Sequence, residues 1–205
     1  DSNHYTIGAM LQAPSIEKID LHNIPDDKKL IRKALLLASQ KADVIITSGG
    51  VSVGKADFMK EVLSEIGKIL FWKLAIKPGR PLAYGTINEA HYFGLPGNPV
   101  SAMVTFYQMV QPAIRLLMGE QGYTPPPKFK AKCTTTITKK PGRMEFQRAI
   151  LTHDQDNLTV TPTRSQGSGI LSSMSEANCF IILEMQHKTV EPGDLVDVQY
   201  MEGIV

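Results

Sequence analysis

The pattern of the chain changes once along its length, and this change limits the folds that it can adopt. Over the first 118 residues, short apolar runs alternate with segments whose apolar residues recur at helical spacing. The segment GEQGYTPPP, residues 119–127, is rich in glycine and proline, and the short β-like runs beyond it are separated by turns. The pattern therefore predicts an α/β domain over residues 1–122 and a small all-β domain over residues 123–205.

The first domain is expected to hold a helix-flanked, mainly parallel sheet. Residues 43–47, DVIIT, form a short apolar run typical of a strand that is buried on both faces. Residues 82–87 and 91–95 predict a hairpin around Asn88-Glu89. Further strands are predicted at residues 16–24 and 69–76, and helices at 1–11, after a cap at Asp26, at 57–67 and at 99–118. No helix is predicted within residues 128–205.

Composition excludes several classes of protein. The chain has 42% hydrophobic and 20% charged residues, as is usual for a globular protein, and its net charge of +2 is too small to indicate a nucleic-acid partner. Its apolar runs are too short to span a bilayer, and no signal peptide opens the chain, which favours a cytoplasmic location. Two cysteines, Cys133 and Cys179, form no disulfide framework and are expected in the core. The five histidines show no metal-ligand spacing along the sequence.

The start of the chain leads us to expect a piece of a longer protein. The first residue is Asp1 rather than Met, and the opening sequence DSNHYTIGAML has the features of a helix cap and its first turns. A helix as the first element of an α/β unit indicates that other elements precede it.

The glycine-rich stretch TSGGVSVGKAD, residues 47–57, follows a predicted strand. Gly49, Gly54 and Lys55 have the spacing of a nucleotide-binding P-loop, but Ala56 stands where that motif needs Ser or Thr, and no apolar strand ending in Asp follows downstream. The P-loop interpretation is therefore weak, and the glycines are instead consistent with a nest whose backbone amides bind an anion. The alternative is a structural turn.

Three side chains add polar groups to this first loop. Ser48 and Ser52 supply hydroxyl donors. Asp57 lies where it can either bind Mg²⁺ through its carboxylate or cap the following helix.

A second candidate anion site is KLAIKPGRP, residues 73–81. Lys73, Ala75 and Lys77 are expected to alternate on one strand, so that both lysines leave the same face. An extended, proline-rich path then places Arg80 on the same side as Lys77. The alternative is a strand edge protected by lysines and prolines.

The third candidate is LPGNPVSA, residues 95–102. Asn98 is expected to cap a helix, with Pro99 in its first position and the free amides near Ser101 at the positive end of the helix dipole. A well-formed helix start needs no ligand, which is the alternative. Because the loops that follow parallel strands gather at one edge of a sheet, the three loops together predict a site for an anionic ligand.

These motifs, in this order and spacing, resemble those of the MoeA family of molybdopterin molybdenumtransferases, and eukaryotic gephyrin has a similar domain. The later stretches PGRMEFQRA, QGSGILSSMSEANCFIILE and VEPGDLVDV resemble the C-terminal β domain of that family. Lys55 departs from the family pattern, in which an acidic residue is expected. Family members also carry further N-terminal domains and an opening strand of the α/β domain, so the resemblance implies a sheet that is incomplete at its N-terminus.

The resemblance implies that molybdate is inserted into adenylylated molybdopterin, with release of AMP and with the help of Mg²⁺. Asp57 would bind Mg²⁺ or organise the phosphate bridge. The residues that would gather molybdate and phosphates are Lys73, Lys77, Arg80, Ser52 and Ser101, of which Lys73, Lys77 and Ser101, like Asp57, are taken as catalytic. Gly49, Gly50, Gly97 and Pro99 would shape the floor of the site, and Ser48, Pro96 and Asn98 complete the predicted substrate-binding set.

Full-length relatives are expected to dimerise, with the cleft completed by the partner subunit, and to contact the molybdopterin adenylyltransferase transiently. The chain alone would then be inactive. Two alternatives remain: a molybdopterin adenylyltransferase, which shares the glycine motif, and a non-catalytic scaffold of the same fold.

Overall fold

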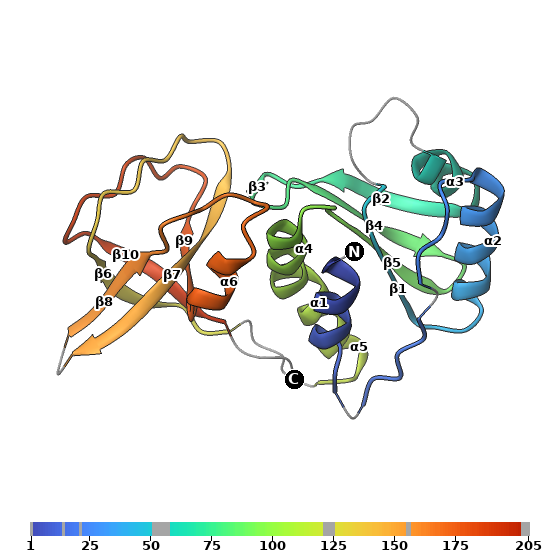
Figure 1. Ribbon diagram of the computed structural model, residues 1–205, viewed down its shortest axis with the longest axis horizontal. Coiled ribbons are helices and arrows are strands. Elements are labelled where there is room, and N and C mark those ends of the chain that lie inside the picture. The colour runs from blue at the N-terminus through green and yellow to red at the C-terminus, as the bar shows by residue number, and fades with distance from the viewer. Residues whose placement is uncertain are drawn as a thin grey trace. The chain divides into compact units, whose positions relative to one another are not determined.

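A computed structural model describes residues 2–13, 15–20, 22–50, 58–120, 126–154 and 157–201. The chain divides into two compact units, which Figure 1 shows as a helix-covered sheet and a group of strands. The first unit holds the described residues of 1–74 and 79–120. The second holds residues 75–78 together with the described residues of 121–203. The boundary near residue 122 stays a prediction, and the short segment 75–78 was not expected in the second unit.

The first unit is built on a four-stranded sheet in the order β1-β5-β4-β2. Its strands are β1 (Val44–Ser48), β2 (Gly67–Lys73), β4 (Pro81–Ile87) and β5 (Ala90–Leu95). In this sheet β1 pairs with β5 in parallel, whereas β5–β4 and β4–β2 are antiparallel. The α/β class is confirmed, but the sheet is mixed rather than mainly parallel, because the predicted hairpin at Asn88-Glu89 joins β4 directly to β5.

Helices cover both faces of this sheet (Figure 1). One face carries α2 (Lys28–Ser39) and α3 (Phe58–Ile66), and the other carries α1 (Ser2–Met10), α4 (Pro99–Thr105), η1 (Phe106–Val110) and α5 (Gln111–Leu117). Neighbouring residues of β5 point to opposite layers, since Tyr92 packs in the core with α2 and α3, and Phe93 packs in the core with α1 and α4. The sheet therefore separates two apolar cores.

Residues 99–117 form one continuous helical segment, as predicted for residues 99–118, but its middle is a π-helix. Pro112 has no backbone N–H, so it cannot donate to the carbonyl four residues earlier. The preceding amide of Gln111 donates to Phe106, five residues back. The proline therefore accounts for the wider turn at this point.

The strand predicted at residues 16–24 is wrong. The described residues 15–20 and 22–27 form no helix or strand, and Ile19 and Ile24 are 46% and 40% exposed. Asp20 Oδ1 accepts a hydrogen bond from the backbone N–H of His22 at 2.7 Å, and His22 has a φ of 56°. This local turn competes with extended pairing.

The helix predicted to follow Asp26 begins one residue later than expected. Asp27 is its cap, and its carboxylate accepts hydrogen bonds from the amides of Lys29 and Leu30, each at 2.9 Å. An aspartate cap was predicted correctly. Because Asp26 and Asp27 are adjacent, however, the sequence did not indicate which of the two is the cap.

The second unit is a six-stranded sheet in the order β3-β7-β8-β6-β10-β9. Its strands are β3 (Ile76–Lys77), β6 (Phe129–Cys133), β7 (Met144–Asp154), β8 (Asn157–Pro162), β9 (Cys179–Leu183) and β10 (Leu195–Tyr200). An additional pairing of β7 with β9 closes five of the strands into a barrel around one apolar core. The predicted all-β character is confirmed, apart from one helix of five residues, α6 (Ser172–Glu176), that was not expected.

The expectation that Lys73 and Lys77 share one strand is also wrong. Lys73 is the last residue of β2, whereas Lys77 belongs to β3, which pairs in parallel with Met144 and Glu145 of β7. The apolar pattern continues through Leu74-Ala75, so the sequence gives no sign that the chain changes sheets at this point.

Both cysteines lie in the core of the second unit, as predicted, with exposed fractions of 1% for Cys133 and 0% for Cys179. Burial raises the pKa of the Cys179 thiol to about 12, so its reactive thiolate is strongly disfavoured at neutral pH. We expect neither cysteine to react with a thiol reagent at pH 7 until the protein is unfolded. Counting labelled thiols by mass, with and without denaturant, tests this, and rapid labelling of the folded chain would contradict it.

No helix in the described part of the chain is both long enough and apolar enough to cross a membrane.

Candidate functional site

Three of the predicted loops begin or end at the same edge of the first sheet. β1 and β5 run in one direction, β4 runs in the opposite direction, and β2, antiparallel to β4, again runs with β1. The carboxyl ends of β1, β5 and β2 therefore lie at one edge, together with the start of β4. This edge carries Ser48, Leu95 and Lys73 as the last residues of their strands.

The loops after β1 and β5 contact each other directly. The backbone N–H of Gly49 donates to the carbonyl of Leu95 at 3.1 Å, and Ser48 Oγ donates to the carbonyl of Pro96 at 3.3 Å. A Cβ on Gly97 would lie 3.7 Å from the Cα of Gly49. Two of the predicted anion loops thus form one continuous surface.

Asn3 fastens these two loops together, and the sequence analysis did not identify it. Its Nδ2 donates to Ser48 Oγ at 2.7 Å and to the carbonyl of Gly97 at 2.8 Å, and only 3% of the residue is exposed. Asn3, Ile7 and Met10 recur at the i, i+4, i+7 spacing of one buried helix face. The sequence signal that could have identified Asn3 is a polar residue on an otherwise apolar helix face.

The first loop depends on the backbone freedom of glycine. Gly49 and Gly50 have φ values of 84° and 70°, in the left-handed region that other residues enter only with strain. No described atom lies within 4 Å of a Cβ built on Gly49, so conformation rather than crowding requires glycine at this position. Residues 51–57, which include the predicted Ser52, Lys55 and Asp57, lie outside the described part of the chain.

The loop after β5 leads into the long helical segment. Pro99 occupies its first turn as predicted, and Asn98 precedes it with extended backbone angles, but the Asn98 side chain makes no capping hydrogen bond to a described amide. Ser101 is 5% exposed, and its carbonyl accepts a hydrogen bond from Thr105 Oγ1. The first amides of the helix point toward the edge that carries the other loops, where an anion can accept hydrogen bonds from them.

Two of the three predicted cations lie in the first unit. Lys73 and Arg80 are exposed and adjoin each other, because the amide of Leu74 donates to the carbonyl of Arg80 at 2.9 Å. Lys77 lies in the second unit, where its Nζ is 3.3 Å from both carboxylate oxygens of Glu145. Lys77 thus already has an anionic partner.

A cavity of about 970 Å³ adjoins the first loop. Its walls come from α1, the segment 15–26, α2, the start of α3, the end of α5 and β1, and Ser48, Gly49 and Gly50 lie on its surface. Its size matches that of pockets that bind small molecules. Within the described residues, neither the cations of the second loop nor residues 96–101 line it. Of the three predicted loops, the cavity therefore adjoins only the first, within the described residues.

The second unit contains a buried cation that was not predicted as a site residue. Arg148 is 1% exposed, and burial lowers its pKa to about 10. Its Nε donates to Ser173 Oγ at 3.2 Å, and one terminal nitrogen donates to the carbonyls of Ser165 and Gly167. Arg148 therefore anchors the stretch QGSGILSS to β7, on the face of the strand opposite Ala149 and Leu151 of the barrel core.

Comparison with protein families assigns both units. Residues 1–116 match the family described as "Probable molybdopterin binding domain", and residues 130–201 match the "MoeA C-terminal region (domain IV)". The chain belongs to the MoeA family.

Individual relatives agree with this assignment. A molybdopterin molybdenumtransferase of Haemophilus influenzae is 44% identical over 97% of this chain, and a gephyrin of Dictyostelium discoideum is 35% identical over 96% of it. The chain spans 50% of the first relative and 32% of the second. It therefore corresponds to half or less of each of these MoeA-family proteins.

Solved structures show the same fold. A molybdenum cofactor biosynthesis protein of Pyrococcus furiosus superposes with a TM-score of 0.77 at 27% identity, covering 98% of this chain and 64% of that protein. A molybdopterin biosynthesis MoeA protein of Pyrococcus horikoshii gives a TM-score of 0.70 at 28% identity, covering 87% of this chain and 42% of its own.

Proposed function

We propose that the protein to which this chain belongs inserts molybdate into adenylylated molybdopterin and releases AMP. Membership of the MoeA family and the relatives named molybdopterin molybdenumtransferase support this reaction. The observation that carries the proposal for this chain is that three strand-end loops lie along one sheet edge, with the loops after β1 and β5 in direct contact. That edge offers backbone amides, a helix start and two cations to an anionic substrate.

The width of this edge fits an extended substrate. The carboxyl ends of β1 and β2 are separated by three inter-strand spacings, or about 14 Å. We place the phosphate bridge against the glycine loop and the helix start, where Gly50 and Ser101 would supply donors. Ser48 and Gly49, whose own donors bind the carbonyls of Pro96 and Leu95, would hold the loop in place. Lys73 and Arg80 would then hold molybdate or a phosphate at the far end of the same edge.

The remaining predicted residues have supporting roles in this proposal. Pro96, Gly97, Asn98 and Pro99 shape the turn that aims the helix amides, and Ser52 adds a hydroxyl to the first loop. Lys77 belongs to the second unit and already pairs with Glu145, so we assign it a weaker role than Lys73.

Asp57 is the residue that we assign to Mg²⁺. It is the one acidic residue in the stretch 47–57, and carboxylate oxygens are the donors that Mg²⁺ prefers. A bound Mg²⁺ would offset negative charge on the phosphate bridge. The rest of the loop would position the substrate through main-chain amides.

The complete protein is proposed to be a cytoplasmic homodimer. Because the chain spans 50% of its Haemophilus influenzae relative, groups outside it are proposed to complete the cleft, and the chain alone is proposed to be inactive. A transient contact with the molybdopterin adenylyltransferase would deliver the substrate directly.

The experiment that tests the function is AMP release by the full-length protein supplied with adenylylated molybdopterin. We expect release to require molybdate. If the protein instead forms adenylylated molybdopterin from ATP and molybdopterin, the adenylyltransferase alternative is correct. If it binds the substrate without any turnover, the scaffold alternative is favoured.

We expect Lys73→Ala and Arg80→Ala each to weaken substrate binding about tenfold, because a hydrogen bond to a charged group contributes about 1.5–3 kcal/mol. Binding of the pterin nucleotide and of molybdate, measured by calorimetry on the full-length protein, checks this. Lys68→Ala is the matched control, since Lys68 is an exposed lysine of the same strand that lies near its opposite end. Equal affinities for all three variants would rule out this part of the site.

A further inference from the structure

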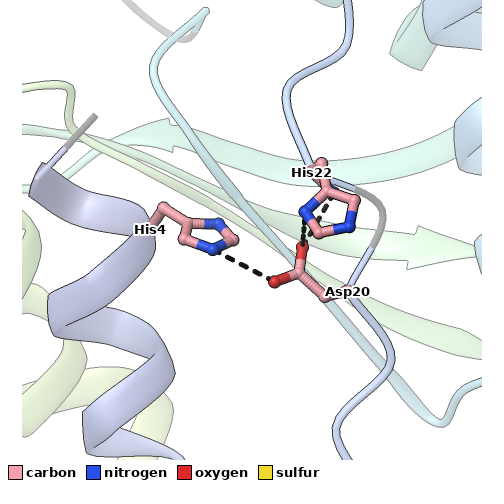
Figure 2. A group of neighbouring side chains, drawn as sticks. All are labelled: His4, Asp20 and His22. Carbon is pink, nitrogen blue, oxygen red and sulfur yellow. Dashed lines mark hydrogen bonds and ion pairs between the residues drawn. The ribbon is translucent and has the colours of Figure 1, made fainter.

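A cluster of metal-ligating side chains was not among the predicted site residues. His4 of α1 meets Asp20 and His22 of the segment 15–26, and their ligand atoms all lie within 4.8 Å of one another. Figure 2 shows the Asp20 carboxylate between the two imidazole rings, which approach it from different segments of the chain. This cluster was not predicted from the sequence. The histidines show no metal-ligand spacing along the chain, and His4 and His22 come together only in the fold.

Local structure holds the three side chains in place. The backbone N–H of His22 donates to Asp20 Oδ1 at 2.7 Å, and the φ of 56° at His22 turns the chain so that its ring faces the same carboxylate. The His4 and His22 rings stack at a centroid distance of 5.9 Å and an angle of 30°. The turn that removes residues 16–24 from strand pairing therefore also assembles the cluster.

The distances fit a transition-metal ion. Two ligands at about 2.1 Å from a tetrahedral Zn²⁺ are about 3.4 Å apart. His4 Nε2 lies 3.2 Å from Asp20 Oδ2, and His22 Nδ1 lies 3.6 Å from Asp20 Oδ1. The His22 side chain is 80% exposed, so it can move the short distance needed to bring the two ring nitrogens closer.

The donor set indicates the kind of metal. Two imidazole nitrogens and one carboxylate oxygen suit Zn²⁺ and related transition metals, whereas Mg²⁺ prefers oxygen donors alone. Each oxygen of Asp20 faces a separate ring nitrogen, so the carboxylate is shared between the two imidazoles rather than paired with one of them.

We propose that His4, Asp20 and His22 bind one Zn²⁺ ion. The ion fastens the segment 15–26 to α1 through ligands from both, and leaves a fourth position for water or an anionic oxygen. All three residues lie on the wall of the 970 Å³ cavity that also contains Ser48, Gly49 and Gly50. The metal site is therefore additional to the proposed Mg²⁺ ligand Asp57, and does not depend on the proposed reaction.

The test is calorimetric titration of the metal-free chain, produced without a histidine tag, with Zn²⁺. We expect one equivalent to bind, and His4→Ala and His22→Ala each to lower the affinity about a hundredfold or more, since even indirect partners of a metal contribute 10–100-fold. Asp20→Asn is a conservative variant, because its side-chain oxygen can still accept the His22 amide while it loses the charge. We expect it also to bind less tightly.

Two further measurements make the result decisive. His153→Ala removes an exposed histidine of the second unit and should leave the Zn²⁺ affinity unchanged. Circular dichroism establishes that each variant is folded, and Co²⁺ added in place of Zn²⁺ should give the visible absorption of a four-coordinate ion. Failure of the wild-type chain to bind one equivalent, or unchanged affinity in folded His4→Ala and His22→Ala, would overturn the proposal.

Discussion

Replacing Asp57 by asparagine in the full-length protein is expected to lower turnover about a hundredfold or more while the protein stays folded. Asparagine caps a helix about as well as aspartate, so a purely structural role at the start of α3 would survive the change. It offers only a neutral oxygen, however, and cannot supply the negative charge that holds Mg²⁺. Removing one electrostatic contribution to a transition state commonly costs about 10²–10³ in rate.

Lys55→Ala is the matched comparison, because the two explanations of this loop predict opposite orders. If the loop were a degraded P-loop, Lys55 would hold a phosphate, its loss would abolish activity, and Asp57→Asn would have little effect. On the molybdenumtransferase proposal Lys55 is dispensable. AMP release as a function of Mg²⁺ concentration distinguishes the two, and an inactive Lys55→Ala beside an active Asp57→Asn would reject the proposed role of Asp57.

The largest effect on stability is expected from Gly85→Ala. Gly85 lies in β4 against β2, where a Cβ would overlap the carbonyl oxygen of Lys68 and lie 2.7 Å from the Cα of Ile69. Both contacts are with backbone, so neither can be relieved by rotating a side chain. We expect the free energy of unfolding to fall by about 3 kcal/mol or more, as for severe overpacking.

Denaturant unfolding of the 205-residue chain measures this change. Gly169→Ala is the control, because no described atom lies within 4 Å of a Cβ at that position and its φ is not positive. It should change the free energy of unfolding by no more than about 0.5 kcal/mol. Similar stability of both variants would mean that β2 and β4 do not approach as closely as described.

The meeting of the loops after β1 and β5 could be predicted from sequence. Continuous apolar runs indicate buried strands, and two parallel strands present their following loops at one edge. Asn3 was missed although a polar residue on an apolar helix face is a recognisable signal. Its partners Ser48 and Gly97 are 45 and 94 residues away along the chain, so local patterns could not identify them.

The errors in the fold have the same physical origin. Residues 16–24 contain enough apolar residues for a strand, but the hydrogen bond from the His22 amide to Asp20 stabilises a turn that hydrophobic alternation does not report. Lys77 was expected beside Lys73, yet its partner Glu145 lies 68 residues further along. Residue pattern predicts which segments are strands more readily than it predicts the sheet that each strand joins.

The small strand β3 has a consequence for how this protein can change in evolution. The second unit takes residues 75–78 from the middle of the sequence that otherwise forms the first unit. A recombination event that transferred residues 123–205 to another protein would leave β3 behind, and β3 is the parallel partner of Met144 and Glu145 in β7. The Glu145 carboxylate would also lose its ion pair with Lys77. The two units are therefore expected to be inherited together, since neither is encoded by one uninterrupted stretch of the gene.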